Sequence, residues 1–168
     1  SIGRYLVEKT YQSNFPSKKL SELAVTMHQG LNTAGEKIKF ELQGHPIIQT
    51  RNITSGSLHF ENMKYLSDED FLKYKDKYIP TKDDILLSNI GTIGKSIVLE
   101  PKDLIDDFLI HWNIFKITSK PELINPKFLK ANFDYLDRTG FFESLQTGGT
   151  VSFISKKVLN EIEIPLPP

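Results

Sequence analysis

The sequence contains no cysteine, which excludes disulfide bonds and thiolate metal sites. It also has no apolar run near the roughly 20 residues that a membrane helix needs. The first residues, SIGRYLVEKTYQ, lack the apolar core of a signal peptide. From these absences we expect a cytoplasmic protein, and a length of 168 residues fits a single domain.

Excess charge of either sign is also absent, since 21 Lys and Arg residues balance 21 Asp and Glu residues. Taken alone, this balance argues against nucleic-acid binding, because phosphate contacts need cations. The charge is uneven along the chain, however: residues 1–60 carry seven cations and four anions, and residues 61–110 carry seven and eleven. Only three residues are Arg, so few side chains can form the bidentate hydrogen bonds by which arginine recognises guanine.

Short apolar runs and turn residues predict a mixture of strands and helices. We expect strands over residues 45–53, 85–90, 96–99, 109–118, 151–154 and 161–165. Ser67, followed three residues later by Asp70, predicts the start of a short helix over 68–74. Asn125-Pro126 predicts another helix start, and Gly140 its end, with a short helix over 141–145 to follow. Ser155 predicts the cap of one more helical turn. The pattern indicates an α+β fold, with a twisted mixed β-sheet or partial barrel and a few short helices.

Several catalytic and cofactor motifs are excluded by spacing. Gly94-Lys95-Ser96 resembles the end of a phosphate-binding loop, but the glycine required at position 89 is an asparagine. The signature of dinucleotide binding is absent, and no serine lies in a nucleophile elbow. The four histidines are scattered without metal-ligand spacing.

One catalytic alternative stays open, a magnesium-dependent nuclease that uses Asp84, Glu100 and Lys102. Two carboxylates and a lysine can hold Mg²⁺ and orient a water molecule. Pro101, however, stands where such sites have a strand residue that donates to the sheet. We therefore favour solvated charges at strand ends over an active site.

Four segments in order resemble the target-recognition domain of type I restriction enzyme specificity subunits. They are LSELAVTMHQG, PIIQTRNITSG, DDILLSNIGTIGKSIVL and TVSFISKKVLNEIEIPLPP. The chain departs from the family pattern at Asp83, where a glycine is usual, and it has one such domain where a whole specificity subunit has two. It is similar also to the recognition domain of single-chain restriction–methyltransferase enzymes. The resemblance implies a linker over 1–17 and a DNA target-recognition domain over 18–168.

The family implies a non-catalytic domain that reads double-stranded DNA for a restriction–modification system. Its implied partners are adenine-specific DNA methyltransferase subunits and a restriction nuclease or translocase subunit. S-adenosylmethionine and Mg²⁺ are expected on those catalytic subunits, and no cofactor in this chain. A protein-interaction scaffold that does not touch DNA is a second alternative.

Residue chemistry selects the candidate DNA contacts within this frame. Arginine reads guanine, and glutamine or asparagine reads adenine, while lysine contacts phosphate. The candidates come from four places. These are the polar tips expected on the 84–99 hairpin, the end of the 45–53 strand, a Gly-rich loop and two lysines. They are Lys37, Lys39, Gln49, Arg51, Asn52, Ser88, Asn89, Thr92, Lys95, Gln146, Thr147 and Thr150.

Overall fold

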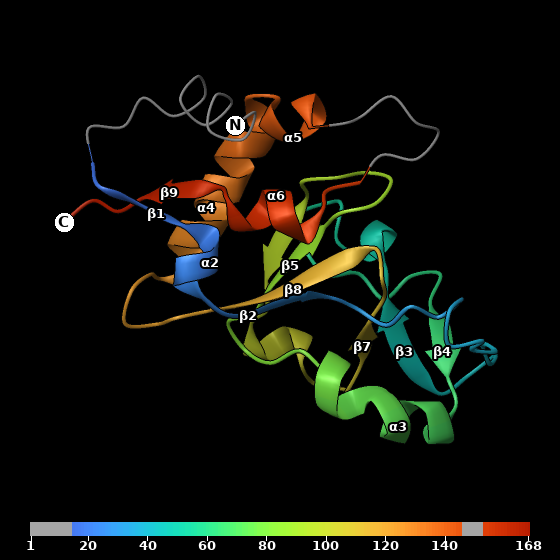
Figure 1. The fold of residues 1–168 in the computed structure, drawn as a ribbon. Helices are drawn as coiled ribbons and strands as arrows, with labels where there is room; N and C mark the ends of the chain where they lie inside the picture. Colours follow the sequence, from blue (N-terminus) through green and yellow to red (C-terminus); the bar gives the residue numbers. More distant parts are fainter. Residues whose placement is uncertain (1–14, 146–152) are drawn as a thin grey trace.

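The computed structural model describes residues 15–145 and 153–168, and its strands form three sheets (Figure 1). A four-stranded antiparallel sheet has the order β2-β8-β5-β6. The second sheet, β4-β3-β7, is mixed, because β3 runs parallel to β7 and antiparallel to β4. A third pair joins β1 to β9, so the first and last described strands lie side by side. This confirms the α+β class with mixed sheets, and the described strands close no barrel.

The elements follow one another in short steps along the chain. The strands are β1 (Ser17–Lys19), β2 (Ala24–Gln29), β3 (His45–Ile48), β4 (Lys64–Leu66), β5 (Ile85–Ser88), β6 (Ser96–Val98), β7 (Leu109–Ile110), β8 (Ile114–Ser119) and β9 (Glu163–Pro165). The α-helices are α2 (Leu20–Leu23), α3 (Asp68–Tyr78), α4 (Pro126–Arg138), α5 (Phe141–Ser144) and α6 (Lys156–Asn160). Two 3-10 turns are η1 (Thr50–Asn52) and η2 (Pro101–Asp103).

The helices begin where the capping residues predict. The Ser67 hydroxyl accepts a hydrogen bond from Asp70 N at the start of α3, and Asn125 Oδ1 accepts one from Lys127 N at the start of α4. Ser155 caps α6 in the same way. Gly140, with φ of 77°, takes the left-handed conformation that separates α4 from α5. These starts and the α4–α5 break are therefore confirmed, although α3 extends four residues beyond the predicted end.

Most predicted strands are shorter than expected, and two of them are broken by turns. The 45–53 strand ends at Ile48, and the chain then turns through η1. The 109–118 strand is broken at His111–Asn113 into β7 and β8, which belong to different sheets. Both breaks occur where the chain turns at one end of the sheets, and alternation of apolar residues alone did not reveal them.

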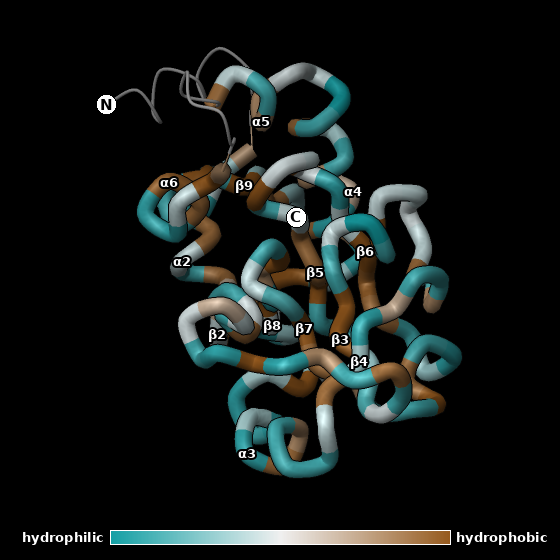
Figure 2. The backbone as a smooth tube through the Cα atoms, turned by 90° about the vertical axis from the view of Figure 1, so that its right-hand side faces the viewer, coloured by the Kyte–Doolittle hydropathy of each residue, from teal (hydrophilic) through white to brown (hydrophobic). Residues whose placement is uncertain are grey.

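The largest apolar cluster fills the space between the four-stranded sheet and the helices α2, α4, α5 and α6. Leu129, Phe133 and Leu136, at helical spacing on α4, are fully buried against Ile85 and Leu87 of β5. Two smaller clusters lie between the sheets and under α3. Figure 2 shows hydrophobic segments along β3, β5 and β7 in the middle of the molecule and hydrophilic segments in the outer loops. Both faces of β5 are thus packed, because Ile85 and Leu87 belong to the largest cluster and Leu86 to the second.

Candidate nucleic-acid interface

Three turns meet around the first residues of β8, and we call them the loop end (Figure 1). They are η1 after β3, the turn over 89–95 between β5 and β6, and the turn over 111–113 between β7 and β8. Asn113 joins all three: its Oδ1 accepts from Thr50 N at 3.2 Å, and its backbone O accepts from Thr50 Oγ1 at 3.0 Å and from Asn89 N at 3.1 Å. The loop end is therefore held together by one asparagine that sequence reasoning did not single out.

The turn between β7 and β8 is also fixed to the end of β2. Gln29 Nε2 donates to Trp112 O at 3.1 Å, and Trp112 N donates to Leu31 O at 3.0 Å. The Trp112 side chain nevertheless remains 40% exposed. The backbone of this turn is thus held firmly while it presents a large aromatic ring at the surface.

His111 supports the same turn from inside. Its Nδ1 accepts a hydrogen bond from Asn113 N at 3.3 Å, and its Nε2 lies 3.1 Å from the Thr33 hydroxyl. Burial lowers the pKa of His111 below its ordinary value, because the charged ring loses hydration. The neutral ring therefore belongs to the folded loop end.

The chain returns to the loop end after the segment over 146–152. Ile154 N donates to Asn89 O at 2.9 Å, and Phe153 forms a bridge with Ile90. The Phe153 side chain is 55% exposed. A second aromatic side chain is therefore available beside the turn that contains Thr92.

The structure brings three of the candidate contact residues to the surface of the loop end. Arg51 and Thr92 are exposed, and Gln49 is half-buried beside η1. Arg51 lies within η1, next to Thr50, whose backbone is fixed by Asn113. An arginine, a glutamine and a threonine on rigidly held turns can donate to and accept from base edges.

Three other candidates are buried, so the expectation that Ser88 and Asn89 form polar tips is wrong, and Asn52 at the strand end is not at the surface either. Asn52 is 2% exposed, because its amide group donates to His59 O and Glu61 O and thereby fixes the following loop. Ser88 is fully buried, and its hydroxyl accepts from Lys95 N. Asn89 is 1% exposed, and its side-chain amide has no hydrogen-bond partner. These residues build the turns from inside rather than present their side chains at the surface.

The candidate lysines lie in two different places. Lys95 is half-exposed at the end of the 89–95 turn, where its Nζ lies 2.7 Å from Asp137 Oδ2 of α4. Lys37 and Lys39 are exposed on the loop between β2 and β3, which is held against α3 by the hydrogen bond from Tyr74 to Glu36. Gln146, Thr147 and Thr150 lie outside the described residues.

The three residues of the nuclease alternative do not form a metal site. Asp84 is 1% exposed, and its oxygens accept hydrogen bonds from Thr81 N and from the Thr118 hydroxyl, with Lys116 Nζ at 3.6 Å. Glu100 pairs instead with Lys102 at 3.3 Å. Over residues 15–145 and 153–168, no group of three or more His, Asp or Glu side chains can hold a metal ion.

The glycine of the Gly-Lys-Ser motif is needed for packing. Gly94 has φ of 85°, and a Cβ atom there would lie 2.5 Å from Cδ2 of Phe142. The left-handed backbone and the contact with a buried ring both require glycine. This geometry agrees with a tight turn between strands rather than a phosphate-binding loop.

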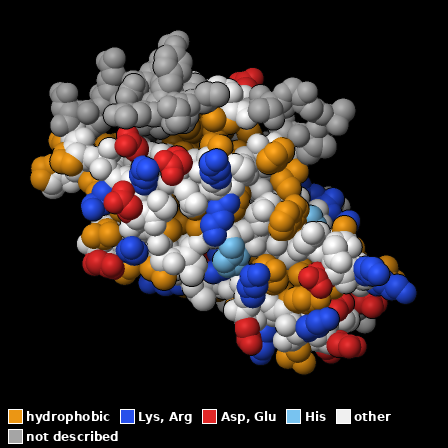
Figure 3. All heavy atoms as spheres, viewed as in Figure 1, with side chains coloured by type: hydrophobic (Ala, Val, Ile, Leu, Met, Phe, Trp, Pro, Cys, Tyr) orange, Lys and Arg blue, Asp and Glu red, His pale blue; other side chains and the backbone are white. Residues whose placement is uncertain are grey.

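Charges of both signs are interspersed over the face in Figure 3. This matches the zero net charge of the sequence.

Within the described part of the chain, no helix is both long and apolar enough to cross a membrane.

Comparison with known proteins agrees with the geometry. A family model described as the type I restriction modification DNA specificity domain matches residues 14–168. A putative type I restriction enzyme specificity subunit of Haemophilus influenzae is 29% identical over 131 residues, which cover 73% of this chain and 32% of that protein. The chain thus spans about a third of that relative.

Solved structures share the fold. The HsdS subunit of Thermoanaerobacter tengcongensis matches 99% of this chain, and 38% of its own, with a TM-score of 0.63 and 18% identity. The type IIG restriction endonuclease BpuSI matches 98% of this chain, and 26% of its own, with a TM-score of 0.64 and 10% identity. At such low identity these likenesses concern the fold alone.

Proposed function

This chain belongs to the type I restriction modification DNA specificity domain family, and we propose that it reads a short sequence of double-stranded DNA and directs an associated methyltransferase to it. The observation that carries this proposal is the loop end. Asn113 fixes three turns from three parts of the chain, and polar side chains stand on those turns. Sequence readout needs base-contacting groups on a rigid frame, and this arrangement meets that need.

Arg51 is the proposed guanine contact. Its side chain is exposed, and no salt bridge involving it occurs among the described residues, so the guanidinium fork can approach O6 and N7 in the major groove. Gln49, two residues earlier, suits the N6 and N7 atoms of adenine. Thr92, at the tip of the turn between β5 and β6, can contact a base or the sugar–phosphate backbone.

Phosphate contacts are proposed for the lysines. Lys95 stands at the loop end, and Lys37 and Lys39 are exposed on the loop between β2 and β3. Such contacts fix the register of a protein on DNA without reading sequence. Gln146, Thr147 and Thr150 remain predicted contacts on residue chemistry alone.

The chain is proposed to be non-catalytic, with chemistry supplied by partners. Asp84, the central residue of the nuclease alternative, is enclosed by hydrogen bonds from Thr81 and Thr118. The proposed partners are adenine-specific methyltransferase subunits, which bring S-adenosylmethionine and flip the target base. A restriction nuclease or translocase subunit that requires Mg²⁺ is proposed beside them. We propose that this assembly works in the cytoplasm.

The test is the binding of duplex DNA by the Arg51→Ala variant. The specificity protein that contains this chain is titrated against a duplex carrying its methylated motif and against a scrambled duplex, at several salt concentrations. Arg51→Ala is expected to weaken binding to the motif by about 1–3 kcal/mol, roughly five- to 150-fold. Binding to the scrambled duplex should change much less.

Lys73→Ala is the matched control, since Lys73 is an exposed cation on α3, an element outside the loop end. It should leave the affinity for the motif unchanged. If Arg51→Ala and Lys73→Ala bind the motif as the unmodified protein does, Arg51 is not a base contact. Absence of any salt-dependent duplex binding would favour the protein-scaffold alternative.

A further inference from the structure

The outer edge of β6 is open. This strand is the last of the four-stranded sheet and pairs only with β5 among the described strands. Ser88 N donates to Lys95 O, so Lys95 and Ile97 direct their backbone groups toward β5. Hydrogen-bonded and non-hydrogen-bonded pairs alternate in an antiparallel sheet, which leaves the backbone groups of Ser96 and Val98 directed outward. An unpaired row of this kind can accept a further strand.

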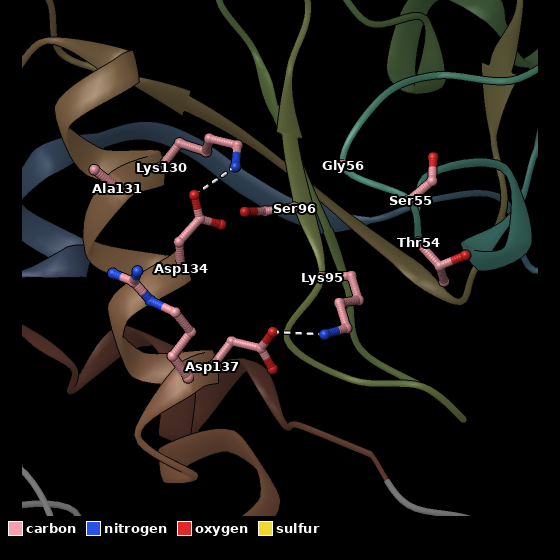
Figure 4. A pocket seen from close by; sticks show the side chains of 10 residues that line it. Thr54, Ser55, Gly56, Lys95, Ser96, Lys130, Ala131, Asp134 and Asp137 are labelled. Atoms are coloured by element: carbon pink, nitrogen blue, oxygen red, sulfur yellow. Dashed lines mark hydrogen bonds and ion pairs between the residues drawn. The ribbon is translucent and has the colours of Figure 1, made fainter.

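Walls on both sides turn this edge into a slot. Figure 4 shows α4 on one side of the strand and the loop with Thr54, Ser55 and Gly56 on the other. A cavity of about 400 Å³ lies between them. Cavities of about 320 and 280 Å³ share lining residues with it or with each other, and they continue to Lys102. The three cavities together follow β6 from Lys95 to Lys102, the course that an added strand would take.

Ser96 supplies a second and independent sign of a ligand. Its side chain lines the cavity and is directed toward Asp134 in Figure 4. The residue is only 4% exposed, yet its hydroxyl has no hydrogen-bond partner. A buried hydroxyl without a partner is unfavourable, because it has lost its hydrogen bonds to water. A backbone carbonyl or amide of a bound segment would satisfy it.

The charges along the slot fit a polypeptide better than nucleic acid. Asp137 pairs with Lys95 at 2.7 Å, and Asp134 pairs with Lys130. Arg138 also lines the first cavity, so its charges are of both signs. A phosphate chain there would meet the two carboxylates and the outward carbonyls of β6 as well as the cations. A peptide carries donors and acceptors in alternation and side chains of either charge, so it matches both the edge and the walls.

We propose that this slot binds an extended segment of the methyltransferase subunit, which adds as a fifth strand beside β6. This inference rests on the proposed function for the identity of the partner. The slot adjoins the loop end, because Lys95 ends the turn between β5 and β6 and Thr54 closely follows η1. A subunit held there stands next to the DNA that the loop end contacts.

Two variants test the slot by different means. Val98→Pro removes an outward N–H and keeps the bonds to β5, and proline is tolerated at such edge positions. Ala131→Trp fills the cavity from an exposed position on α4. Leu72→Trp is the matched control, because Leu72 is exposed on α3, outside the slot. Each is placed in the full-length specificity protein, and its affinity for the methyltransferase subunit is measured by calorimetry.

Val98→Pro and Ala131→Trp are each expected to weaken that affinity at least tenfold, while Leu72→Trp leaves it unchanged. Hydrogen exchange at the Ser96 and Val98 amides should slow on complex formation in the unmodified protein. If Val98→Pro fails to fold, Ala131→Trp alone decides, because it alters an exposed side chain.

Unchanged affinity in Ala131→Trp, or fast exchange at both amides within the complex, overturns the slot and leaves DNA recognition intact. Loss of motif binding in Ala131→Trp, with methyltransferase affinity unchanged, also overturns it and assigns the slot to DNA. Motif binding by a protein that does not bind the methyltransferase at all overturns the slot as well. Failure of motif binding itself, by contrast, counts against the proposed function.

Discussion

Thr50 donates to Asn113 twice, from its backbone N to Oδ1 at 3.2 Å and from its hydroxyl to the backbone O at 3.0 Å. Thr50 lies in η1, and Asn113 lies in the turn between β7 and β8. The pair therefore joins two turns that are 63 positions apart in the chain. Arg51 follows Thr50 directly, so its backbone position is fixed by the same pair.

Asn113→Ala is expected to destabilise the protein by about 1–2 kcal/mol, because Thr50 N is left without its acceptor. Asn113→Asp keeps an oxygen at the same position and should lose less. Urea unfolding of both variants measures the difference. Equal losses for alanine and aspartate would show that the Oδ1 contact contributes little.

Asp84→Ala is expected to cost about 3–5 kcal/mol in the free energy of unfolding, because Lys116 would remain buried without its carboxylate. Adding Lys116→Met should recover part of that loss, since the buried charge is then gone. Thermal unfolding of the single and double variants checks this. Plasmid cleavage that requires Mg²⁺ and disappears in Asp84→Ala would contradict the structural role and restore the nuclease alternative.

Alanine variants at Gly91 and Gly94 distinguish the cost of backbone strain from the cost of a steric clash. Both have positive φ, 79° and 85°, but an added Cβ meets nothing within 4 Å at Gly91 and lies 2.5 Å from the Phe142 ring at Gly94. Gly91→Ala should therefore cost about 1–2 kcal/mol from the backbone alone. Gly94→Ala should cost clearly more. Equal shifts in the unfolding midpoint would contradict the packing of Phe142 against the turn.

Stability should fall as the pH is lowered, through His28 and His111. Burial lowers the pKa of both rings in the folded protein. The unfolded chain, with an ordinary histidine pKa of about 6.5, then binds more protons than the folded one. The stability contributed by the neutral rings is complete above that value and decreases as the pH falls from it toward the folded pKa.

His111→Gln should flatten this dependence, whereas His59→Gln, at an exposed position, serves as the control. Urea unfolding between neutral and mildly acidic pH measures the slope. A slope that is the same in the unmodified protein and in His111→Gln would contradict the buried neutral ring.

Sequence patterns predicted the core hairpin and the helix starts well. Ile85 and Leu87 of β5 are buried, as the apolar run indicates, and Asn125 and Ser155 cap their helices. These features depend on neighbours within a few residues. Local chemistry therefore sufficed to predict them.

The site was harder to predict, because exposure depends on contacts that are distant in the chain. Asn52 and Ser88 have the chemistry of DNA contacts, but backbone groups of adjoining loops use their polar atoms. Asn113 and Trp112 were hidden within an alternating apolar run that predicts one strand. The segment His111-Trp112-Asn113, with two polar residues inside that run, was the available sign of a break.

The measurement that tests the central claim most directly is a methylation map. The full-length specificity protein is expressed with its methyltransferase subunits in a host that lacks DNA methylation, and methylated adenines are located by sequencing. The map is repeated with Arg51→Ala and Lys73→Ala. We predict one methylated motif that becomes degenerate or is lost with Arg51→Ala and is unchanged with Lys73→Ala. An identical motif and extent of methylation in all three proteins would contradict base reading at the loop end.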